Sequence, residues 1–423
     1  MYPNHLPLIS LLPFAVSVAV ALEPIHYPIS RRGGSFPTAD TANLTYLLEQ
    51  LQIIETRFTA TTREFSGNQV VRKPKRKHGT QANTILLGEV GREGNWFANL
   101  RIGDPPQNVD MDLDMLTADW WISSTSSDKG SYFLDFNSKT PAHQWLHSLL
   151  PSGAYLGLAP STSLSQLKTV SMMAQLMEKE VIDTPVWSLV LLNREEGLFS
   201  IGGTSVTSLR KVERDTEDSL SVFEDHENMN WNEASKESYK TVDSSKEWKW
   251  LKVQGSDGWW QILMQGIWVD GVKVLQNQPV ILDVNTPFML APPKAARSFY
   301  SSIAGSRRLP PPHDQFHSYP CLSPPQIHLE FASWNVEVMK GRNDRMSSAL
   351  GGKFSLGRLE TGSGYCIGNI VESRMGVEIL MNGKDHETGW GGGPGVWIIG
   401  EPFFRDVQVA FDWKAKKVGL QKV

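Results

Sequence analysis

Apolar and polar residues alternate in short runs broken by glycine and proline from Thr84 onward. This pattern predicts strands, since alternation places every second side chain on one face of a sheet. Helical spacing appears only briefly in this part of the chain. The strands are expected at Trp96–Ile102, Val109–Leu113, Trp120–Ile122, Val186–Leu192 and Leu198–Ile201, and the helices at Val170–Glu180 and Pro293–Ile303. The expected fold class is all-β with short helices.

The N-terminal part has a different pattern. An apolar stretch, Leu6–Leu22, is interrupted by Pro13 and ends in the small residues Ala19-Val20-Ala21. It predicts a cleaved secretory signal peptide over residues 1–21. A helical pattern follows, beginning near Asn43-Leu44-Thr45, with apolar residues at Leu47, Leu48, Leu51 and Ile54.

A basic run ends this helical region and marks a processing site. Endoproteases of the secretory pathway that prefer paired basic residues would cut at Lys75, Arg76 or Lys77, so residues 22–77 are interpreted as a propeptide. The other interpretation of the run is a solvated, flexible basic segment. Asn43 begins an Asn-Leu-Thr sequon and is a candidate glycosylation site in that propeptide.

Composition narrows the functional classes. The chain has 423 residues, 40% of them hydrophobic, and a formal net charge of −4. This length accommodates two domain-sized units, and the weak charge favours neither nucleic acid nor an anionic membrane as partner. No later stretch is long enough to span a membrane. Residues 206–247 contain a segment rich in acidic residues, serine and lysine, which predicts a solvated inserted loop.

The two cysteines, Cys321 and Cys366, are the only ones in the chain. In an oxidising compartment they are natural disulfide partners, the other interpretation being two buried free thiols. They cannot form a four-ligand zinc site alone, and His313 and His317, four residues apart in a proline-rich loop, are not expected to bind a metal. Neither a metal site nor a cofactor is predicted.

A weak internal repeat points to the chemistry. The string Leu113–Thr117 resembles Leu282–Thr286, and each copy is followed by an apolar-apolar-Gly element that ends at Gly157 or Gly400. A duplication of this kind predicts two similar β lobes, each of which offers one aspartate. Two carboxylates held close together share a proton, so one can activate a water molecule while the other donates to the developing oxyanion. The two candidate carboxylates are Asp114 and Asp283.

Over nearly everything after the basic run, the chain resembles the pepsin-like aspartic proteases. The resemblance rests on a long collinear set of segments: Ile102–Gln107 followed by Asp114 and Trp121, Leu156–Ala159, Ile201–Gly203, Trp259–Ile262, Asp270-Gly271, Asp283–Pro292, Trp397–Arg405, Phe411-Asp412 and Val418-Gly419. Cys321 and Cys366 stand where many members of the family have a disulfide in the second lobe.

The resemblance implies a bilobal fold of two β-barrel-like lobes with a peptide-binding cleft between them. The N-terminal lobe would span residues 78–205 and the C-terminal lobe residues 248–423. It implies Asp114 and Asp283 as catalytic residues, Thr117 and Thr286 as hydroxyls that support them, and Gly157 and Gly400 as the ψ-loop glycines. The implied protein is a monomer that binds a polypeptide, exported to the exterior, the cell wall or the vacuole.

Both active-site motifs depart from the family's Asp-Thr-Gly. Met115 and Val284 replace the threonines that reach across to the other lobe, and they are expected to make no such hydrogen bonds. Leu116 and Asn285 replace the glycines, and the added side chains are expected to tilt the aspartates out of position, Leu116 more seriously, since asparagine tolerates left-handed backbone angles.

The interval between Trp121 and Gly157 is much shorter than the family uses. The missing part corresponds to the flap, whose tyrosine and glycines cover the substrate. Tyr132 and Tyr155, the only tyrosines in the interval, lack the flap's setting, and Trp121 is either a neighbour of a flap or plain core. An error in the coding sequence for Ser123–Pro151 is one explanation of the shortening.

Two functions from different classes follow. The first is an aspartic endopeptidase that hydrolyses peptide bonds at acid pH. The second is a pseudoprotease whose cleft binds peptides, proteins or a cell-wall component without turnover.

Overall fold

The computed structural model describes the chain in thirteen segments. The predicted signal peptide at residues 1–21, the predicted processing residues Lys75, Arg76 and Lys77, Tyr132 and the rest of the interval 123–153 lie outside the described residues. The described residues are 24–32, 41–65, 94–102, 107–122, 154–160, 170–192, 196–204, 209–211, 239–241, 247–254, 258–339, 352–374 and 395–423.

The first half of the chain is largely made of short strands, as its alternating pattern predicts. Its elements are β1 (Ile25–Arg31), α1 (Leu44–Phe65), β2 (Trp96–Ile102), β3 (Gln107–Asp114), β4 (Trp120–Ile122), β5 (Ala154–Gly157), α3 (Met172–Glu178), β6 (Val186–Leu191), β7 (Glu196–Ile201), β8 (Leu209–Lys211) and β9 (Tyr239–Thr241).

The second half of the chain is also largely made of short strands. Its elements are β10 (Lys249–Lys252), β11 (Gln261–Val269), β12 (Val272–Leu282), β13 (Met289–Ala291), α5 (Pro293–Ser301), β14 (Arg307–Arg308), β15 (His317–Pro320), β16 (Ile327–Phe331), β17 (Trp334–Val338), η3 (Gly352–Phe354), β18 (Ser355–Arg358), β19 (Tyr365–Gly368), β20 (Ile370–Glu372), β21 (Trp397–Ile399), α8 (Glu401–Phe404), β22 (Val407–Asp412) and β23 (Lys417–Lys422).

The fold class is the predicted one, mainly β and consistent with a bilobal pepsin-like arrangement. The expected strands and helices agree with the observed ones to within a few residues. The region predicted as a polar loop contains a two-stranded sheet, because β8 pairs with β9. The remainder of that loop lies outside the described residues.

A ten-stranded sheet joins the two halves of the chain, in the order β10-β23-β22-β6-β7-β1-β2-β3-β5-β4. The C-terminal strands β22 and β23 thereby continue a sheet made by the first lobe. Aromatic packing fixes this junction: Trp187 of β6 stacks on Phe411 of β22 with ring centroids 4.0 Å apart, and Trp260 packs edge-on against Trp187. The second lobe adds sheets of seven and four strands.

The internal repeat is visible in the strand pairing. In the first lobe β5 lies between β3 and β4, parallel to β3 and antiparallel to β4. In the second lobe β21 lies in the same way between β12 and β13. Each copy therefore brings the end of an aspartate-bearing strand beside a strand that leads into a glycine.

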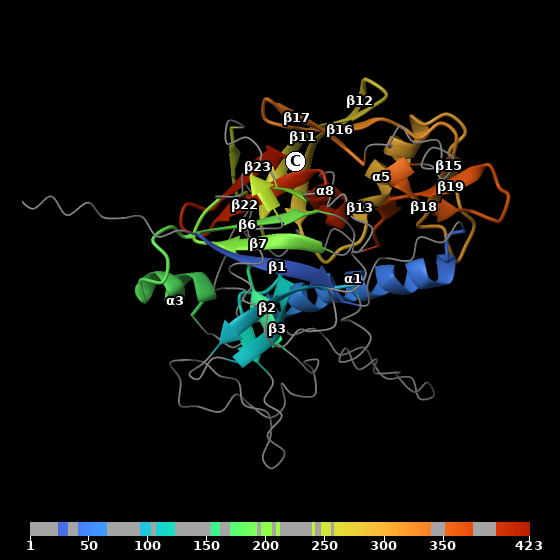
Figure 1. Ribbon diagram of the computed structural model, residues 1–423. Coiled ribbons are helices and arrows are strands. Elements are labelled where there is room, and N and C mark those ends of the chain that lie inside the picture. Colours follow the sequence, from blue (N-terminus) through green and yellow to red (C-terminus); the bar gives the residue numbers. More distant parts are fainter. Residues whose placement is uncertain are drawn as a thin grey trace, which may run out of the picture.

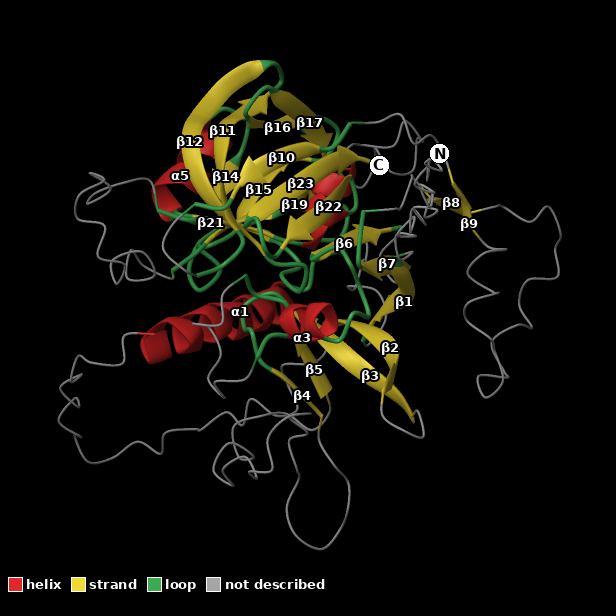
Figure 2. Ribbon diagram, turned by 90° about the vertical axis from the view of Figure 1, so that its left-hand side faces the viewer, coloured by secondary structure: helices red, strands yellow, loops and turns green. Residues whose placement is uncertain are grey.

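The segment interpreted as a propeptide is integrated into the fold. Strand β1 lies inside the ten-stranded sheet, antiparallel to β7 on one side and to β2 on the other. Helix α1, drawn in blue in Figure 1, runs between the second-lobe strands and the β3–β5 region, which Figure 2 shows from the side. Its start at Leu44 confirms the predicted helix.

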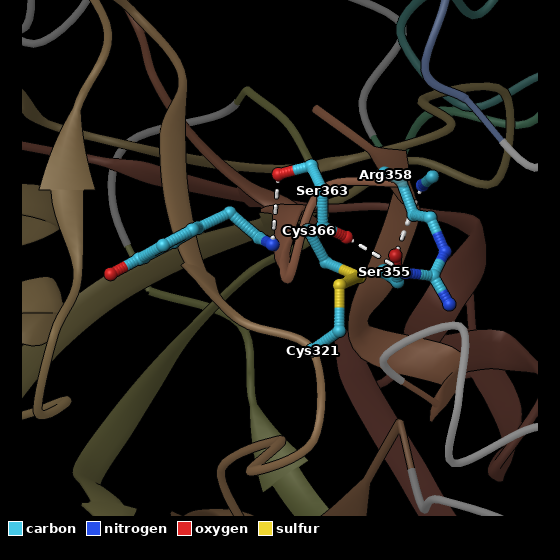
Figure 3. Close-up of a disulfide and its surroundings, with 7 residues drawn as sticks. Cys321, Ser355, Arg358, Ser363 and Cys366 are labelled. Atoms are coloured by element: carbon cyan, nitrogen blue, oxygen red, sulfur yellow. Dashed lines mark hydrogen bonds between the residues drawn. A yellow bond between two sulfur atoms is a disulfide. The ribbon is translucent and has the colours of Figure 1, made fainter. Parts of the chain in front are cut away.

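A disulfide joins Cys321 and Cys366, 45 residues apart, which confirms the pairing and excludes the free-thiol interpretation. Cys366 lies in β19, beside Ser363, whose carbonyl oxygen accepts a hydrogen bond of 2.7 Å from Arg358 (Figure 3). The bridge therefore closes the end of the four-stranded sheet.

Candidate functional site

Asp114 is the last residue of β3. Its Oδ1 accepts a hydrogen bond of 2.9 Å from the backbone nitrogen of Leu116. Its Oδ2 accepts one of 3.0 Å from the hydroxyl of Thr117. The side chain is 16% exposed, so this carboxylate is anchored and mostly buried.

Asp283 follows β12 and is fully buried. Its Oδ2 accepts a short hydrogen bond of 2.6 Å from the hydroxyl of Thr286. Burial raises the pKa of the Asp283 carboxyl above its ordinary value, although the Arg57 guanidinium and the Thr286 hydroxyl act in the opposite direction. Each aspartate thus keeps a hydroxyl partner three residues further along.

The two glycines at the ends of β5 and β21 lie where the chain has no room for a side chain. A Cβ on Gly157 would lie 2.1 Å from the backbone oxygen of Asp119. A Cβ on Gly400 would lie 1.9 Å from the backbone oxygen of Thr286. Glycine is required at both positions because backbone atoms cannot move aside as a flexible side chain can.

Arg57 of helix α1 connects the two carboxylates. One of its terminal nitrogens, Nη2, lies 3.8 Å from Oδ1 of Asp114 and 3.7 Å from Oδ2 of Asp283. Burial alone would lower the pKa of the guanidinium, but the two carboxylates more than offset this and raise it. The guanidinium therefore stays charged where it lies between the two aspartates.

The apolar face of α1 fills the space around this contact. Leu47, Leu51, Ile54 and Phe58 recur at helical spacing and are each at most 2% exposed. They form one cluster with Leu116 of the first lobe and with apolar residues of the second, among them Phe288, Leu290, Phe316 and Val371. Leu116, the residue in place of the motif glycine, is thus a first-lobe side chain in the cluster that the helix joins.

The expectation that the Met115 side chain makes no hydrogen bond to the other lobe is wrong. The sulfur of Met115 accepts a hydrogen bond of 3.4 Å from the backbone nitrogen of Val284, so Met115 does reach across, although sulfur is a weak acceptor. In the first lobe, the backbone nitrogen of Leu116 donates to the Asp114 carboxylate although glycine is replaced there.

Asn285 makes the stronger connection between the lobes. Its side-chain oxygen accepts a hydrogen bond of 2.8 Å from the backbone nitrogen of Trp96, and its amide nitrogen donates one of 2.5 Å to the backbone oxygen of Leu113. Both first-lobe partners belong to the sheet that carries Asp114. The backbone of Asn285 does not take a positive φ, so its tolerance of left-handed angles plays no part.

The structure also places three other residues considered in the sequence analysis, namely Tyr155, Trp121 and His317. Tyr155 lies in β5 and is half-buried, and Trp121 lies in β4. The fold brings Glu372, distant in the sequence, to His317, with 2.8 Å between Nε2 and Oε1. Burial lowers the pKa of His317 against the opposing effect of that carboxylate. Among the described residues, no group of three His, Cys, Asp or Glu side chains could hold a metal ion.

Sequence reasoning missed Arg57 altogether and missed the role of Asn285 as a connection between the lobes. The signal for Arg57 is its position three residues after Ile54 and directly before Phe58, which places a cation on an apolar helix face. A cation in that position needs a buried anion as partner. No pattern in the sequence around Asn285 predicts its hydrogen bonds to Trp96 and Leu113, because those bonds depend on how close the two lobes lie.

Comparison with known proteins adds the family context. The sequence model of the family described as eukaryotic aspartyl protease matches residues 238–423. An aspartic protease of Phaffia rhodozyma is 24% identical over 169 residues, which is 39% of this chain and 34% of that protein. This chain therefore spans about a third of that relative's length.

Two longer matches cover more of this chain. The aspartic-type endopeptidase ctsD of Aspergillus fumigatus is 19% identical over 356 residues, 81% of this chain and 68% of the relative. Rhizopuspepsin-4 of Rhizopus niveus is 22% identical over 305 residues, 67% of this chain and 73% of the relative. Among the described residues, no helix is long and apolar enough to cross a membrane.

Proposed function

Because this chain is a pepsin-like member of the aspartic protease family, we propose that it is a latent aspartic endopeptidase. Asp114 and Asp283 would hydrolyse peptide bonds in a polypeptide bound between the lobes, at acid pH and without a metal or cofactor. The observation that carries this proposal is the convergence of both carboxylates on one guanidinium nitrogen, Nη2 of Arg57.

The two aspartates have different surroundings, which suggests their roles. The raised pKa of the buried Asp283 favours it as the protonated member, which donates to the carbonyl oxygen of the scissile bond. Asp114, more exposed, would act as the base that takes a proton from the attacking water. The new C–O bond gives a tetrahedral intermediate, and its collapse breaks the C–N bond after a proton passes to the leaving amine.

Helix α1 accounts for the latency. The guanidinium of Arg57 holds the two carboxylates in an ion-paired state, and the apolar face of the helix occupies the space that a substrate would need. Hydrolysis therefore requires displacement of the helix. The apolar segment before residue 22 supports export of the protein to the exterior, the cell wall or the vacuole. The basic run at 72–77 supports proteolytic processing.

The test is an acid protease assay on protein whose basic run has been cut. The variant Leu51→Asp places a carboxylate on the buried helix face and should release the helix, whereas the neighbouring exposed position gives the matched control Gln52→Asp. We expect cut Leu51→Asp protein to degrade denatured casein at about pH 3–5, where one aspartate is protonated and the other ionised.

This activity should be blocked by a statine-type inhibitor and disappear with Asp114→Asn. The uncut wild type should be inactive. Circular dichroism would verify that Leu51→Asp remains folded. Absence of hydrolysis across the pH range, with the helix demonstrably removed and the fold intact, would contradict the proposal.

A second candidate function is a pseudoprotease that binds polypeptides without turnover. The packing of Leu116 with helix α1 favours this function. Leu116 replaces a motif glycine, and its side chain here forms part of an apolar contact that keeps the helix in place. Specific binding of a polypeptide that survives Asp283→Ala, measured by calorimetry, would support this function. Robust hydrolysis that depends on Asp114 would exclude it.

A further inference from the structure

A polar cluster of the second lobe borders the space that helix α1 occupies. Two of its members, Gln315 and Glu372, are each 2% exposed. The guanidiniums of Arg297 and Arg308 contact Glu372 from the surface, and Arg374 follows β20 two residues further on. None of these residues takes part in the proposed hydrolysis, so the cluster needs an explanation of its own.

Two donors of this cluster meet at one oxygen atom. Oε1 of Glu55, two residues before Arg57 in helix α1, accepts a hydrogen bond of 3.1 Å from Nε2 of Gln315. The same oxygen accepts one of 2.5 Å from the backbone nitrogen of Arg374. The second lobe thus presents a pair of donors that fits the oxygen of a carboxyl group.

Contacts within the second lobe hold these donors in place. Nε2 of Gln315 also donates to the carbonyl oxygen of Glu372 at 2.7 Å, and the backbone nitrogen of Glu372 donates to the carbonyl oxygen of Gln315 at 2.9 Å. The backbone nitrogen of Ser373 donates to the carbonyl oxygen of Ala291 at 2.8 Å. Because none of these bonds involves helix α1, the pair of donors would remain after displacement of the helix.

The charge of Glu372 is already satisfied by its own neighbours. Nη2 of Arg297 lies 2.9 Å from its Oε2, and Nε of Arg308 lies 3.1 Å from its Oε1. Burial would raise the pKa of the Glu372 carboxyl, but hydrogen bonds from Arg297 and His317 outweigh burial and lower the pKa. Glu372 is therefore ionised and offsets part of the positive charge around it.

Arg374 brings a third guanidinium to the cluster. It contacts the Asp314 carboxylate, which it shares with Arg308. In the part of the chain that the structure describes, three guanidiniums of the second lobe therefore meet two carboxylates of that lobe, and His317 can only add positive charge. A carboxylate at the position of Glu55 balances the third guanidinium.

We propose that Gln315 and the backbone of Arg374 form a carboxyl-binding subsite between the lobes, and that the polypeptide substrate places a glutamate side chain in it. Along the helix axis Glu55 and Arg57 are about 3 Å apart, close to the length of one extended residue, so the glutamate lies within a few residues of the scissile bond. This inference rests on the proposed function, because it assigns a substrate class to the same interlobe site.

The experiment measures the binding of short statine-containing peptides to cut Leu51→Asp protein by calorimetry at about pH 5. The peptides carry Glu, Gln, Met or Lys in turn at each of three positions on either side of the statine. At a single position we expect Glu to bind at least about tenfold more tightly than Met, which leaves two donors without an acceptor. Gln, which keeps the oxygen and lacks the charge, should lie between them, and Lys should bind least. Equal affinity for Glu and Met at every position, or no binding of any peptide, would overturn the proposal.

Three variants in the same background assign the preference to the subsite. Gln315→Met removes one donor and should reduce the preference for Glu over Met at least about threefold, provided that circular dichroism shows an intact fold. Arg374→Gln changes an exposed side chain and keeps the backbone donor, so it should reduce the preference for Glu over Gln and keep that for Gln over Met. The matched control Lys414→Gln removes an exposed charge in the turn between β22 and β23 and should change neither preference. An unchanged preference for Glu over Gln in Arg374→Gln would also overturn the proposal.

The failures of the two proposals are distinguishable. If Glu peptides bind preferentially and no peptide or casein is hydrolysed, the endopeptidase proposal fails and the subsite stands. If casein is hydrolysed and Glu is preferred at no position, the subsite proposal fails and the endopeptidase proposal stands.

Discussion

Arg57→Gln is the most informative single substitution, since it removes the charge between the two aspartates and keeps a polar side chain of moderate length. The Arg57 side chain is 21% exposed, Asp114 16%, and Asp283 is fully buried. At separations of 3.7 and 3.8 Å each attraction is worth about 4 kcal/mol in an environment of intermediate dielectric constant.

Most of that attraction offsets the cost of removing the three groups from water. The loss of one partner of a buried ion pair typically costs about 3–5 kcal/mol, and these contacts are longer than hydrogen bonds, so we expect Arg57→Gln to lower the free energy of unfolding by about 2–3 kcal/mol at neutral pH. Arg57→Lys, which keeps the charge, should lose less.

The loss of stability caused by Arg57→Gln should depend on pH in a defined direction. The Asp283 pKa is already raised in the folded protein, and the loss of Arg57 raises it further. As the pH falls through that pKa, Asp283 takes up a proton, its charge disappears and the missing guanidinium matters less. The difference in stability between wild type and Arg57→Gln should therefore be largest near neutral pH and shrink in acid.

Urea unfolding followed by tryptophan fluorescence at about pH 7 and pH 4 would measure both quantities. The same substitution in an Asp114→Asn/Asp283→Asn background should cost much less, because the double-mutant cycle removes the charges that Arg57 meets. An equal cost of Arg57→Gln in both backgrounds, or at both pH values, would refute the electrostatic reasoning.

Three further predictions concern stability and can be measured by the same unfolding assay. Asn285→Ala should cost about 2–4 kcal/mol, because it leaves the backbone groups of Trp96 and Leu113 without their partner, and a cost below about 0.5 kcal/mol would remove Asn285 as a connection between the lobes. Replacement of Cys321 and Cys366 by serine opens a 45-residue loop and should cost about 4 kcal/mol, whereas unchanged stability would show that the bridge does not constrain the unfolded chain. Asp283→Asn removes a carboxyl whose pKa is raised on folding, so wild type should gain stability relative to this variant as pH falls from neutral through that pKa, and the opposite slope would contradict the assignment.

The sequence predicted the fold well because its signals are local. Alternation of apolar residues places the strands, and the spacing of Leu47, Leu51 and Ile54 places helix α1. The repeated strings around Asp114 and Asp283 correctly suggested two related strand arrangements, since each requires the close backbone approach at Gly157 or Gly400.

The candidate site was harder to predict because its contacts join distant segments. Arg57 precedes Asp283 by more than half of the chain, and only the fold brings the two side chains together. Met115 and Leu116 replace the threonine and the glycine of the family's motif, and from the sequence we expected these replacements to disturb the aspartates. In the structure these residues have other uses, one as a sulfur acceptor and the other as packing surface for the helix.

Binding of a statine-type inhibitor at about pH 4, measured by calorimetry, tests the central claim most directly, namely that the two aspartates are assembled and covered. The intact wild-type chain should not bind the inhibitor, whereas cut Leu51→Asp protein should bind it, and Asp114→Asn should abolish that binding. Tight binding to the uncut wild type would contradict coverage by helix α1. Absence of binding to the folded, helix-released variant would contradict an assembled pair of aspartates.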